Sequence, residues 1–129
     1  MQRDDINPWD WSKALGFSQG VSLSGGSRVL ICSGQTAAGP DGSPPATDDM
    51  QEQVRAALTN LTQVLDGAGM TPADVVKITV YTTDVDAALG AWAEVKGTFG
   101  ANLPASTLVG VTRLAFPALK VEIEAIAAA

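Results

Sequence analysis

The feature that most constrains the fold of this chain is a long amphipathic segment between Asp49 and Ala68. Apolar residues recur in it at the three- and four-residue spacing that places them on one face of a helix. They are Met50, Val54, Ala57, Leu58, Leu61, Val64, Leu65 and Ala68. Asp49 followed by Glu52 suits an N-terminal cap, and Gly67 and Gly69 supply a stop. This helix needs a sheet or a second helix to cover its apolar face.

Stretches typical of β-strands precede this helix. Phe17 to Leu23 and Arg28 to Thr36 flank a glycine-bearing turn at Ser24–Ser27, and this arrangement predicts a hairpin. Val29 to Cys32 is continuously apolar, which predicts a central strand covered on both faces. Ala37 to Thr47 collects glycine and proline, so we expect an exposed loop there.

Three more strands and a second helix are expected after the helix at 49–68. Val75 to Thr83 is rich in β-branched residues that alternate with polar ones, which predicts a strand. Asp84 is a suitable cap for a helix that continues to Phe99. Two strands, Ser106 to Leu114 and Lys120 to Ala127, close the chain. The order ββαβαββ predicts an α+β fold with two helices on one face of the sheet.

This pattern leaves the other face of the sheet without a cover. A chain of 129 residues fits a single domain, residues 1–129, with no room for a second one. An uncovered apolar sheet face in such a chain calls for a partner, and identical chains related by cyclic symmetry are the simplest supply. Oligomerisation follows from the pattern, whereas the number of subunits does not.

Composition excludes several classes of function. The net charge is −6 and only eight residues are Lys or Arg, which opposes the basic surface that nucleic-acid binding requires. The chain has no histidine and one cysteine, Cys32, so we expect neither a zinc site nor an intrachain disulfide. Acid–base chemistry must therefore use carboxylates, lysine, tyrosine or positioned water.

Location and cofactor use are also constrained. No apolar run approaches the roughly 20 residues of a membrane span. The acidic, polar start lacks the pattern of a secretory signal, so a cytoplasmic protein without membrane contact is expected. No phosphate-binding loop, dinucleotide motif or metal-ligand spacing is present, and no cofactor or metal is expected.

Three short segments could carry chemistry, and each has a second interpretation. Glu122 and Glu124 share one face of a strand about 7 Å apart, as an acid–base pair or as a solvated polar face. The spacing alone favours the solvated face. Ser33–Gly34 lets a ligand approach the backbone or marks a bulge. Trp9 and Trp11 form a binding stripe or anchor the N-terminal segment, and anchoring is the more common role.

Four motifs in fixed order carry a family resemblance. They are GFSQGV at 16–21, SGQT at 33–36, QVRAALTNL at 53–61 and VEIEAIA at 121–127. Together they resemble the Rid (YjgF-type) family of reactive enamine and imine deaminases, from about Gly16 to Ala127. The resemblance implies a chorismate-mutase-like fold of the bacterial trimeric type, with a mixed sheet. It also implies a homotrimer around a central barrel, with small-molecule clefts between subunits and no organic cofactor.

The resemblance assigns roles to particular residues. In characterised members an arginine after a Pro-Ala pair binds the substrate carboxylate, and a glutamate in the last strand positions the attacking water. Glu122 matches the glutamate, but Ser106 replaces the arginine, which indicates a subgroup without it. A lost charge-assisted contact costs about 1.5 to 3 kcal/mol, so a carboxylate-bearing imine should bind poorly. Arg113 follows at an odd offset and would point to the opposite face of a regular strand.

The remaining pocket positions are less polar than in active relatives. Phe17 stands where they usually carry tyrosine, and Trp92 replaces a small or amidic residue, with core packing an equal alternative for both. Backbone groups near Ser106 and Leu108 are expected to hold developing charge. The expected site consists of Glu122 as the catalytic residue, with Phe17, Ser33, Gly34, Trp92, Ser106 and Leu108 binding the substrate.

Two functional hypotheses of different classes remain. The first is a hydrolase of the kind that includes 2-iminobutanoate/2-iminopropanoate deaminases, acting on a reactive imine, enamine or related molecule without a carboxylate. The second is a noncatalytic trimer that binds a small molecule and has a regulatory role. Ser106 separates them, because retained chemistry without the arginine demands a substrate without a carboxylate. Ribonuclease activity ranks third because of the acidic charge and the absent histidine.

Overall fold

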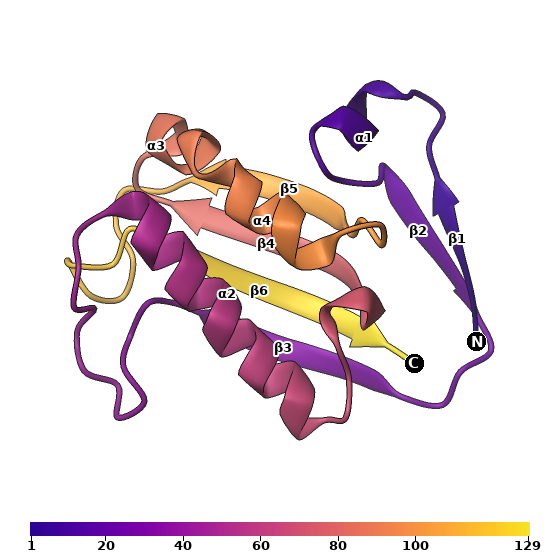
Figure 1. Cartoon of the computed structure of the whole chain (residues 1–129), viewed down its shortest axis with the longest axis horizontal. Helices are drawn as coiled ribbons and strands as arrows, with labels where there is room; N and C mark the ends of the chain where they lie inside the picture. The colour runs from indigo at the N-terminus through magenta and orange to yellow at the C-terminus, as the bar shows by residue number, and fades with distance from the viewer.

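A four-stranded sheet of order β3-β6-β4-β5 forms the centre of the computed structural model, which describes residues 1–129 (Figure 1). Its strands are β3 (Val29–Gln35), β6 (Val121–Ala128), β4 (Val75–Thr82) and β5 (Ala105–Gly110). β6 pairs antiparallel with both β3 and β4, whereas β4 and β5 are parallel. The predicted α+β class is confirmed, and the sheet is mixed.

Helices cover one face of this sheet. They are α2 (Met50–Gly67), α3 (Val85–Gly90) and α4 (Trp92–Phe99), and the short 3-10 helix η1 (Pro72–Asp74) leads into β4. In Figure 1, α2, α3 and α4 all lie in front of the sheet, as predicted for the helical layer. None of the helices combines the length and the apolar character that crossing a membrane requires.

Both predicted helix caps are present. The Asp49 carboxylate accepts a hydrogen bond of 3.0 Å from the N–H of Glu52 at the start of α2. The Asp84 carboxylate accepts one of 3.0 Å from the N–H of Ala87 at the start of α3. The second predicted helix is broken at Ala91 into α3 and α4. The residue before the break is a glycine, whose low helix propensity weakens the continuation.

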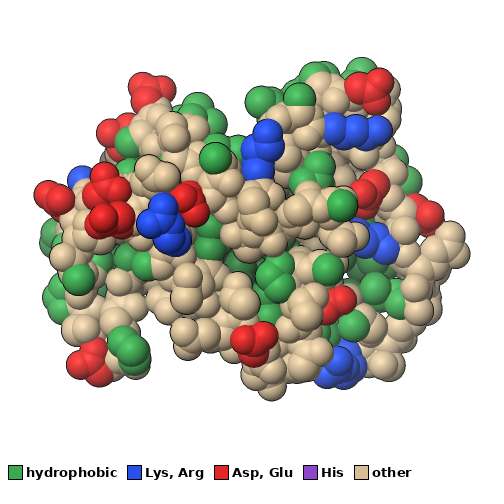
Figure 2. Space-filling model, viewed as in Figure 1, with side chains coloured by type: hydrophobic (Ala, Val, Ile, Leu, Met, Phe, Trp, Pro, Cys, Tyr) green, Lys and Arg blue, Asp and Glu red, His purple; other side chains and the backbone are tan.

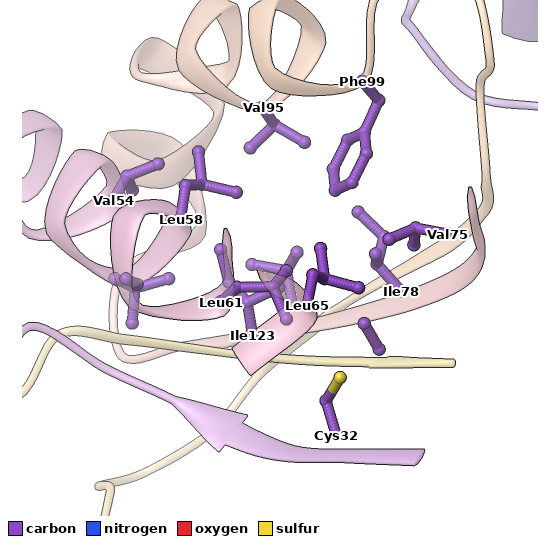
Figure 3. Packing of buried hydrophobic residues seen from close by; sticks show 14 of the residues in the cluster. Cys32, Val54, Leu58, Leu61, Leu65, Val75, Ile78, Val95, Phe99 and Ile123 are labelled. Carbon is purple, nitrogen blue, oxygen red and sulfur yellow. The ribbon is translucent and has the colours of Figure 1, made fainter. Parts of the chain in front are cut away.

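The core lies between the helices and the sheet. Residues that point toward one another in Figure 3 are Leu58, Leu61 and Leu65 of α2, Val95 and Phe99 of α4, Ile78 of β4 and Ile123 of β6. All of them are buried, and each such side chain stabilises the fold by about 1.5 to 3 kcal/mol. Because the whole cluster is on the helical side, the opposite sheet face contributes nothing to it.

The first 24 residues form a separate ribbon rather than part of the predicted hairpin. β1 (Gln2–Ile6) pairs antiparallel with β2 (Gly20–Ser24), and the short helix α1 (Trp11–Ala14) lies between them. Figure 1 shows this ribbon beside the four-stranded sheet. The predicted pairing of 17–23 with 28–36 is therefore wrong, because β1 takes the place of β3 as the partner of β2.

The turn after β2 explains this correction. Gly25 and Gly26 have φ of 69° and 84°, a conformation that favours glycine. The N–H groups of Ser27 and Arg28 both donate to the carbonyl of Ala129 at 3.0 Å. The chain thus leaves the turn toward the end of β6 and does not return along β2.

Strand β3 occupies an edge of the sheet, which corrects the prediction of a central strand. Cys32 faces the core and Leu30 packs against it, but Val29 and Ile31 are 68% and 77% exposed. The apolar run from Val29 to Cys32 therefore has two apolar faces. The core covers one face, and nothing in the same chain covers the other. β6 is central instead, because it has a hydrogen-bonded partner on each side.

Candidate functional site

The sheet face opposite the helices is uncovered, and we refer to it as the open face. Its residues alternate along the strands with those that face the core. They are Val29 and Ile31 of β3, Lys77, Thr79 and Tyr81 of β4, Thr107 of β5, and Glu122, Glu124 and Ile126 of β6. Charged and hydroxyl groups of three strands thus lie next to exposed isoleucine and valine. Lys77 and Tyr81 were not among the residues predicted for the site, although the sequence alternation in β4 carries the signal for them.

Glu122 lies against a glycine that has no room for a side chain. Gly34 follows Ser33 in a bulge of β3, where the register with β6 shifts between Cys32 and Gln35. A Cβ at Gly34 would overlap the Glu122 carboxylate and come within 2.7 Å of its Cγ. The structure therefore brings Ser33, Gly34 and Glu122 together. Both interpretations of the glycine hold, since it marks a bulge and also lets another group approach the backbone.

The two glutamates of β6 have different surroundings. The Tyr81 hydroxyl donates to Glu124 Oε1 at 2.6 Å. This hydrogen bond to a carboxylate raises the pKa of Tyr81, because the neutral phenol is the form that donates. Glu122, opposite Tyr81 in the register, accepts no hydrogen bond and forms no ion pair within the chain. Glu122 therefore keeps all of its carboxylate lone pairs available for a water or a ligand, whereas one oxygen of Glu124 is engaged by Tyr81.

A hollow of about 230 Å³ lies on the open face beside Glu124. Its walls are formed by Ile31, Cys32, Lys77, Thr79, Glu124, Ala125 and Ile126. The Lys77 ammonium is held by a 2.7 Å hydrogen bond to Thr107 Oγ1. Burial raises the pKa of the Cys32 thiol, which keeps it protonated and unreactive.

Ser106 and Leu108 lie on the other side of the sheet from Glu122. In the parallel register Ser106 is beside Ile78 and Leu108 beside Val80, and both partners are buried under the helices. The Ser106 hydroxyl donates to the carbonyl of Pro104 at 3.2 Å, and Leu108 packs against the core. A single chain therefore does not bring Ser106 and Glu122 to one place.

Phe17 and Trp92 both lie close to the turn that follows α1, and their surroundings differ. The Trp92 indole packs against the core, and its N–H donates to the carbonyl of Leu15 at 3.0 Å. This arrangement matches the core-packing interpretation of Trp92. Phe17 is outside the core cluster and pairs edge to face with Trp11. The N–H of the next residue, Ser18, donates to the carbonyl of Pro104, so Phe17 lies beside the strand that carries Ser106.

Trp9 and Trp11 do not anchor the N-terminal ribbon. Their exposed fractions are 60% and 57%, so the anchoring interpretation is wrong. Arg3, which the sequence did not single out, performs that role. Its guanidinium donates to the carbonyls of Ala73, Val75 and Leu103 at 2.9, 3.1 and 3.0 Å. No local pattern marks such a residue, because its partners are distant in sequence.

Arg3 and Arg113 both donate to backbone carbonyls of the chain. The Arg3 fork is filled by the backbone carbonyls at the starts of β4 and β5. Arg113 lies in the turn after β5 and donates to the carbonyls of Leu114 and Ala115. The expected strand to Leu114 ends at Gly110, so strand alternation does not determine where Arg113 points.

The chain is an α+β protein with helices on one face of a mixed sheet. The open face carries polar groups, including the Glu122 carboxylate over the Gly34 bulge. The family described as Endoribonuclease L-PSP matches residues 11–129. The chain belongs to this family, which is also called YjgF/Rid/RutC.

Several relatives are similar over most of their length. The 2-iminobutanoate/2-iminopropanoate deaminase of Escherichia coli K12 is 36% identical over 119 residues, which cover 86% of this chain and 85% of the relative. The Rid-family protein YyfB of Yersinia pestis, of unknown function, is 35% identical with a TM-score of 0.91 and full coverage of both chains. TdcF of E. coli with bound serine is 30% identical, with a TM-score of 0.69 and coverage of 88% and 87%.

Proposed function

We propose that this chain hydrolyses a reactive imine or enamine that carries no carboxylate, in clefts between the subunits of a homotrimer. The observation that carries the proposal is the unpaired Glu122 carboxylate over Gly34 on the open face. Membership of a family with relatives named as imine deaminases supports the reaction class.

The reaction needs one water and no cofactor. Water adds to the carbon of the C=N bond while the nitrogen takes up a proton. The C–N bond then breaks, and the products are a carbonyl compound and ammonia. Glu122 would accept a hydrogen bond from the attacking water and thereby direct its lone pair to the carbon. Backbone N–H groups near Ser106 and Leu108 would hold the developing charge.

The distribution of groups within one chain supports a shared cleft. Glu122, Ser33 and Gly34 lie on the open face, while Ser106 faces the helical side at the β5 edge and Phe17 lies beside that edge. A cleft that contains both sets therefore needs two chains. We place the open faces of three chains around a central barrel of the chorismate-mutase-like type. The exposed Val29 and Ile31 would be buried there.

The choice of a substrate without a carboxylate rests on Ser106. Its hydroxyl is a single neutral donor, which donates to the Pro104 carbonyl at 3.2 Å. A paired, charge-assisted contact to a carboxylate is therefore absent at this position.

Substitution of Glu122 by glutamine tests the proposal, with Glu124→Gln as a control on the same strand face. We expect Glu122→Gln to abolish the hydrolysis of a neutral imine. Sedimentation should still show a trimer for this variant. Glu124→Gln should keep turnover, because its carboxylate is engaged by Tyr81. Unchanged turnover in Glu122→Gln would return Glu122 to a solvated polar face. A wild-type protein that binds small neutral ligands but turns over no imine would be the noncatalytic binder.

A further inference from the structure

Two aromatic rings stand on the N-terminal segment outside the core. Trp11 and Phe17 have ring centroids 5.7 Å apart and planes at 78°. This edge-to-face arrangement is one that aromatic pairs prefer. The Trp11 side chain is nevertheless more than half exposed, so much of its indole remains accessible. A large apolar surface that the chain itself leaves uncovered indicates a contact with another group.

Helix α4 fixes the turn that carries this pair. The Trp92 indole N–H donates to the carbonyl of Leu15, and the Lys96 ammonium donates to the carbonyl of Ala14 at 2.9 Å. Gly16 has φ of +85°, and the missing Cβ leaves room for the Lys96 methylene groups. Contacts on three successive residues hold the turn, so the aromatic pair is ordered before any ligand arrives.

The pair adjoins the proposed cleft. Ser18, the residue after Phe17, pairs with Ala105 at the start of β5, next to Ser106. Figure 2 shows that the molecule is hollowed between the N-terminal ribbon, residues 1–24, and the part formed by α3 and α4. Hydrophobic side chains are visible on both sides of this hollow. The aromatic rings and Ser106 thus belong to the same edge of the molecule.

The cations beside this segment are already engaged. Lys13 lies 3.6 Å from the Asp10 carboxylate, and Lys96 is bonded to the backbone of Ala14. The Ser106 hydroxyl is bonded to the carbonyl of Pro104. Each of these cations thus already has a partner within the chain, and the accessible surface of the aromatic pair itself is apolar.

We infer that Trp11 and Phe17 bind the substituent of the substrate and make the site selective for imines that carry an aromatic ring. This inference rests on the proposed function and names the substrate class of that same site. A flat ring stacks on the exposed indole of Trp11, whose orientation is held by Phe17. Trp11 is thus a specificity-determining residue, and its contribution is absent when the substituent is a methyl group.

The experiment compares two imines that differ in this substituent. An amine oxidase produces them from 2-phenylethylamine and from ethylamine, and removal by the protein is measured in competition with semicarbazide. For the wild type we expect kcat/KM to be at least about tenfold higher for the phenyl-bearing imine, from stacking and ring burial. Trp11→Ala should reduce this ratio at least about threefold, which corresponds to one aromatic contact.

Trp9→Ala is the matched control. Trp9 is as exposed as Trp11 and lies two residues away, but it has no ring partner. We expect this variant to keep the wild-type ratio. A second measurement, calorimetric titration with phenylacetamide and with acetamide, reads the same contact without turnover. Phenylacetamide should bind more tightly to the wild type and to Trp9→Ala than to Trp11→Ala.

The outcomes separate the inference from the proposed function. Equal ratios in Trp11→Ala, Trp9→Ala and wild type would overturn the inference and leave the hydrolase intact. Loss of the trimer in Trp11→Ala, seen by sedimentation, would make the pair a subunit contact and overturn the inference as well. Absence of turnover for every imine would overturn the hydrolase. Preferential phenylacetamide binding that depends on Trp11 would in that case still support Trp11 as the binding site for an aromatic ring.

Discussion

Glu122 and Glu124 share a strand, a face and a side-chain chemistry, and their neighbours alone give them different roles. Glu124 has a phenol that donates to it, whereas Glu122 lies against the backbone of a glycine and receives no hydrogen bond within the chain. The sequence spacing predicted the shared face correctly. It left the choice between an acid–base pair and a solvated face open, because that choice depends on residues in β3 and β4.

A methyl group at Gly34 should displace the Glu122 carboxylate. Gly34→Ala is therefore expected to lower imine turnover to the level of Glu122→Gln. Its effect on stability should be at most about 1 to 3 kcal/mol, as for other overpacked sites, because the displaced group is the end of a flexible side chain. Turnover and urea unfolding measure the two effects.

Gly67→Ala is the control for this substitution. Gly67 ends α2, and nothing lies within 4 Å of the position that a Cβ would take there, so alanine fits. We expect unchanged turnover and a gain of about 0.5 to 1 kcal/mol in the free energy of unfolding. Full activity of Gly34→Ala would show that the position of Glu122 is not set by this glycine.

The raised pKa of Tyr81 makes stability depend on alkaline pH. In the unfolded chain the phenol ionises near pH 10, about its ordinary value, and in the folded chain it ionises at higher pH. The folded state thus keeps a proton that the unfolded state loses, so this contribution is complete below about pH 10 and is lost as pH rises through the folded pKa.

Tyr81→Phe isolates this contribution. Between pH 8 and pH 11, at fixed protein concentration, the wild type should lose more unfolding free energy than the variant, because only the wild type has the ionising phenol. Denaturant titrations at the two pH values measure the difference. An equal loss in both proteins would mean that Tyr81 does not contribute to the alkaline transition.

At the scale of elements, the sequence predicted structure that local signals determine, but it did not predict which strands pair. α2 was predictable because its caps and its apolar period lie within one segment. The hairpin prediction failed because the partner of β2 is β1, whose sequence, QRDDI, has no apolar alternation. The edge position of β3 also depends on distant segments, since β6 reaches it from the end of the chain.

Strand β1 of the N-terminal ribbon is attached to the rest of the molecule through one guanidinium. Arg3 has a mostly buried side chain that satisfies three carbonyls at the starts of β4 and β5. Arg3→Met should remove charged hydrogen bonds worth about 1.5 to 3 kcal/mol each and loosen β1 and β2 locally. Hydrogen exchange should accelerate in residues 2–24. Exchange in β6, at the centre of the sheet, should stay slow, and acceleration there would show that the ribbon and the sheet unfold together.

At the scale of the whole molecule, the open face predicts assembly. Ile31 is exposed in the single chain, and the proposed trimer buries it. Ile31→Glu should therefore give a folded monomer, because a buried unpaired charge is costly whereas an exposed one is tolerated. Sedimentation and circular dichroism provide the two readouts.

Leu89→Glu serves as the control for the assembly prediction. Leu89 is an exposed apolar residue on α3, on the helical side of the sheet. We expect this variant to remain trimeric. A wild-type monomer at micromolar concentration, or a trimer of Ile31→Glu, would contradict the assignment of the open face to the subunit interface.

Glu122 lies on the open face and Phe17 lies beside the β5 edge, and this separation has a consequence for mixtures of variant chains. Two kinds of inactive chain, one with Glu122→Gln and one with Phe17→Asp, should complement each other when they are unfolded together and refolded. Each mixed ring then contains a junction where an intact glutamate from one chain meets an intact phenylalanine from the next. Activity would return in the mixture although neither variant is active by itself, because each catalytic centre is built from two neighbouring chains.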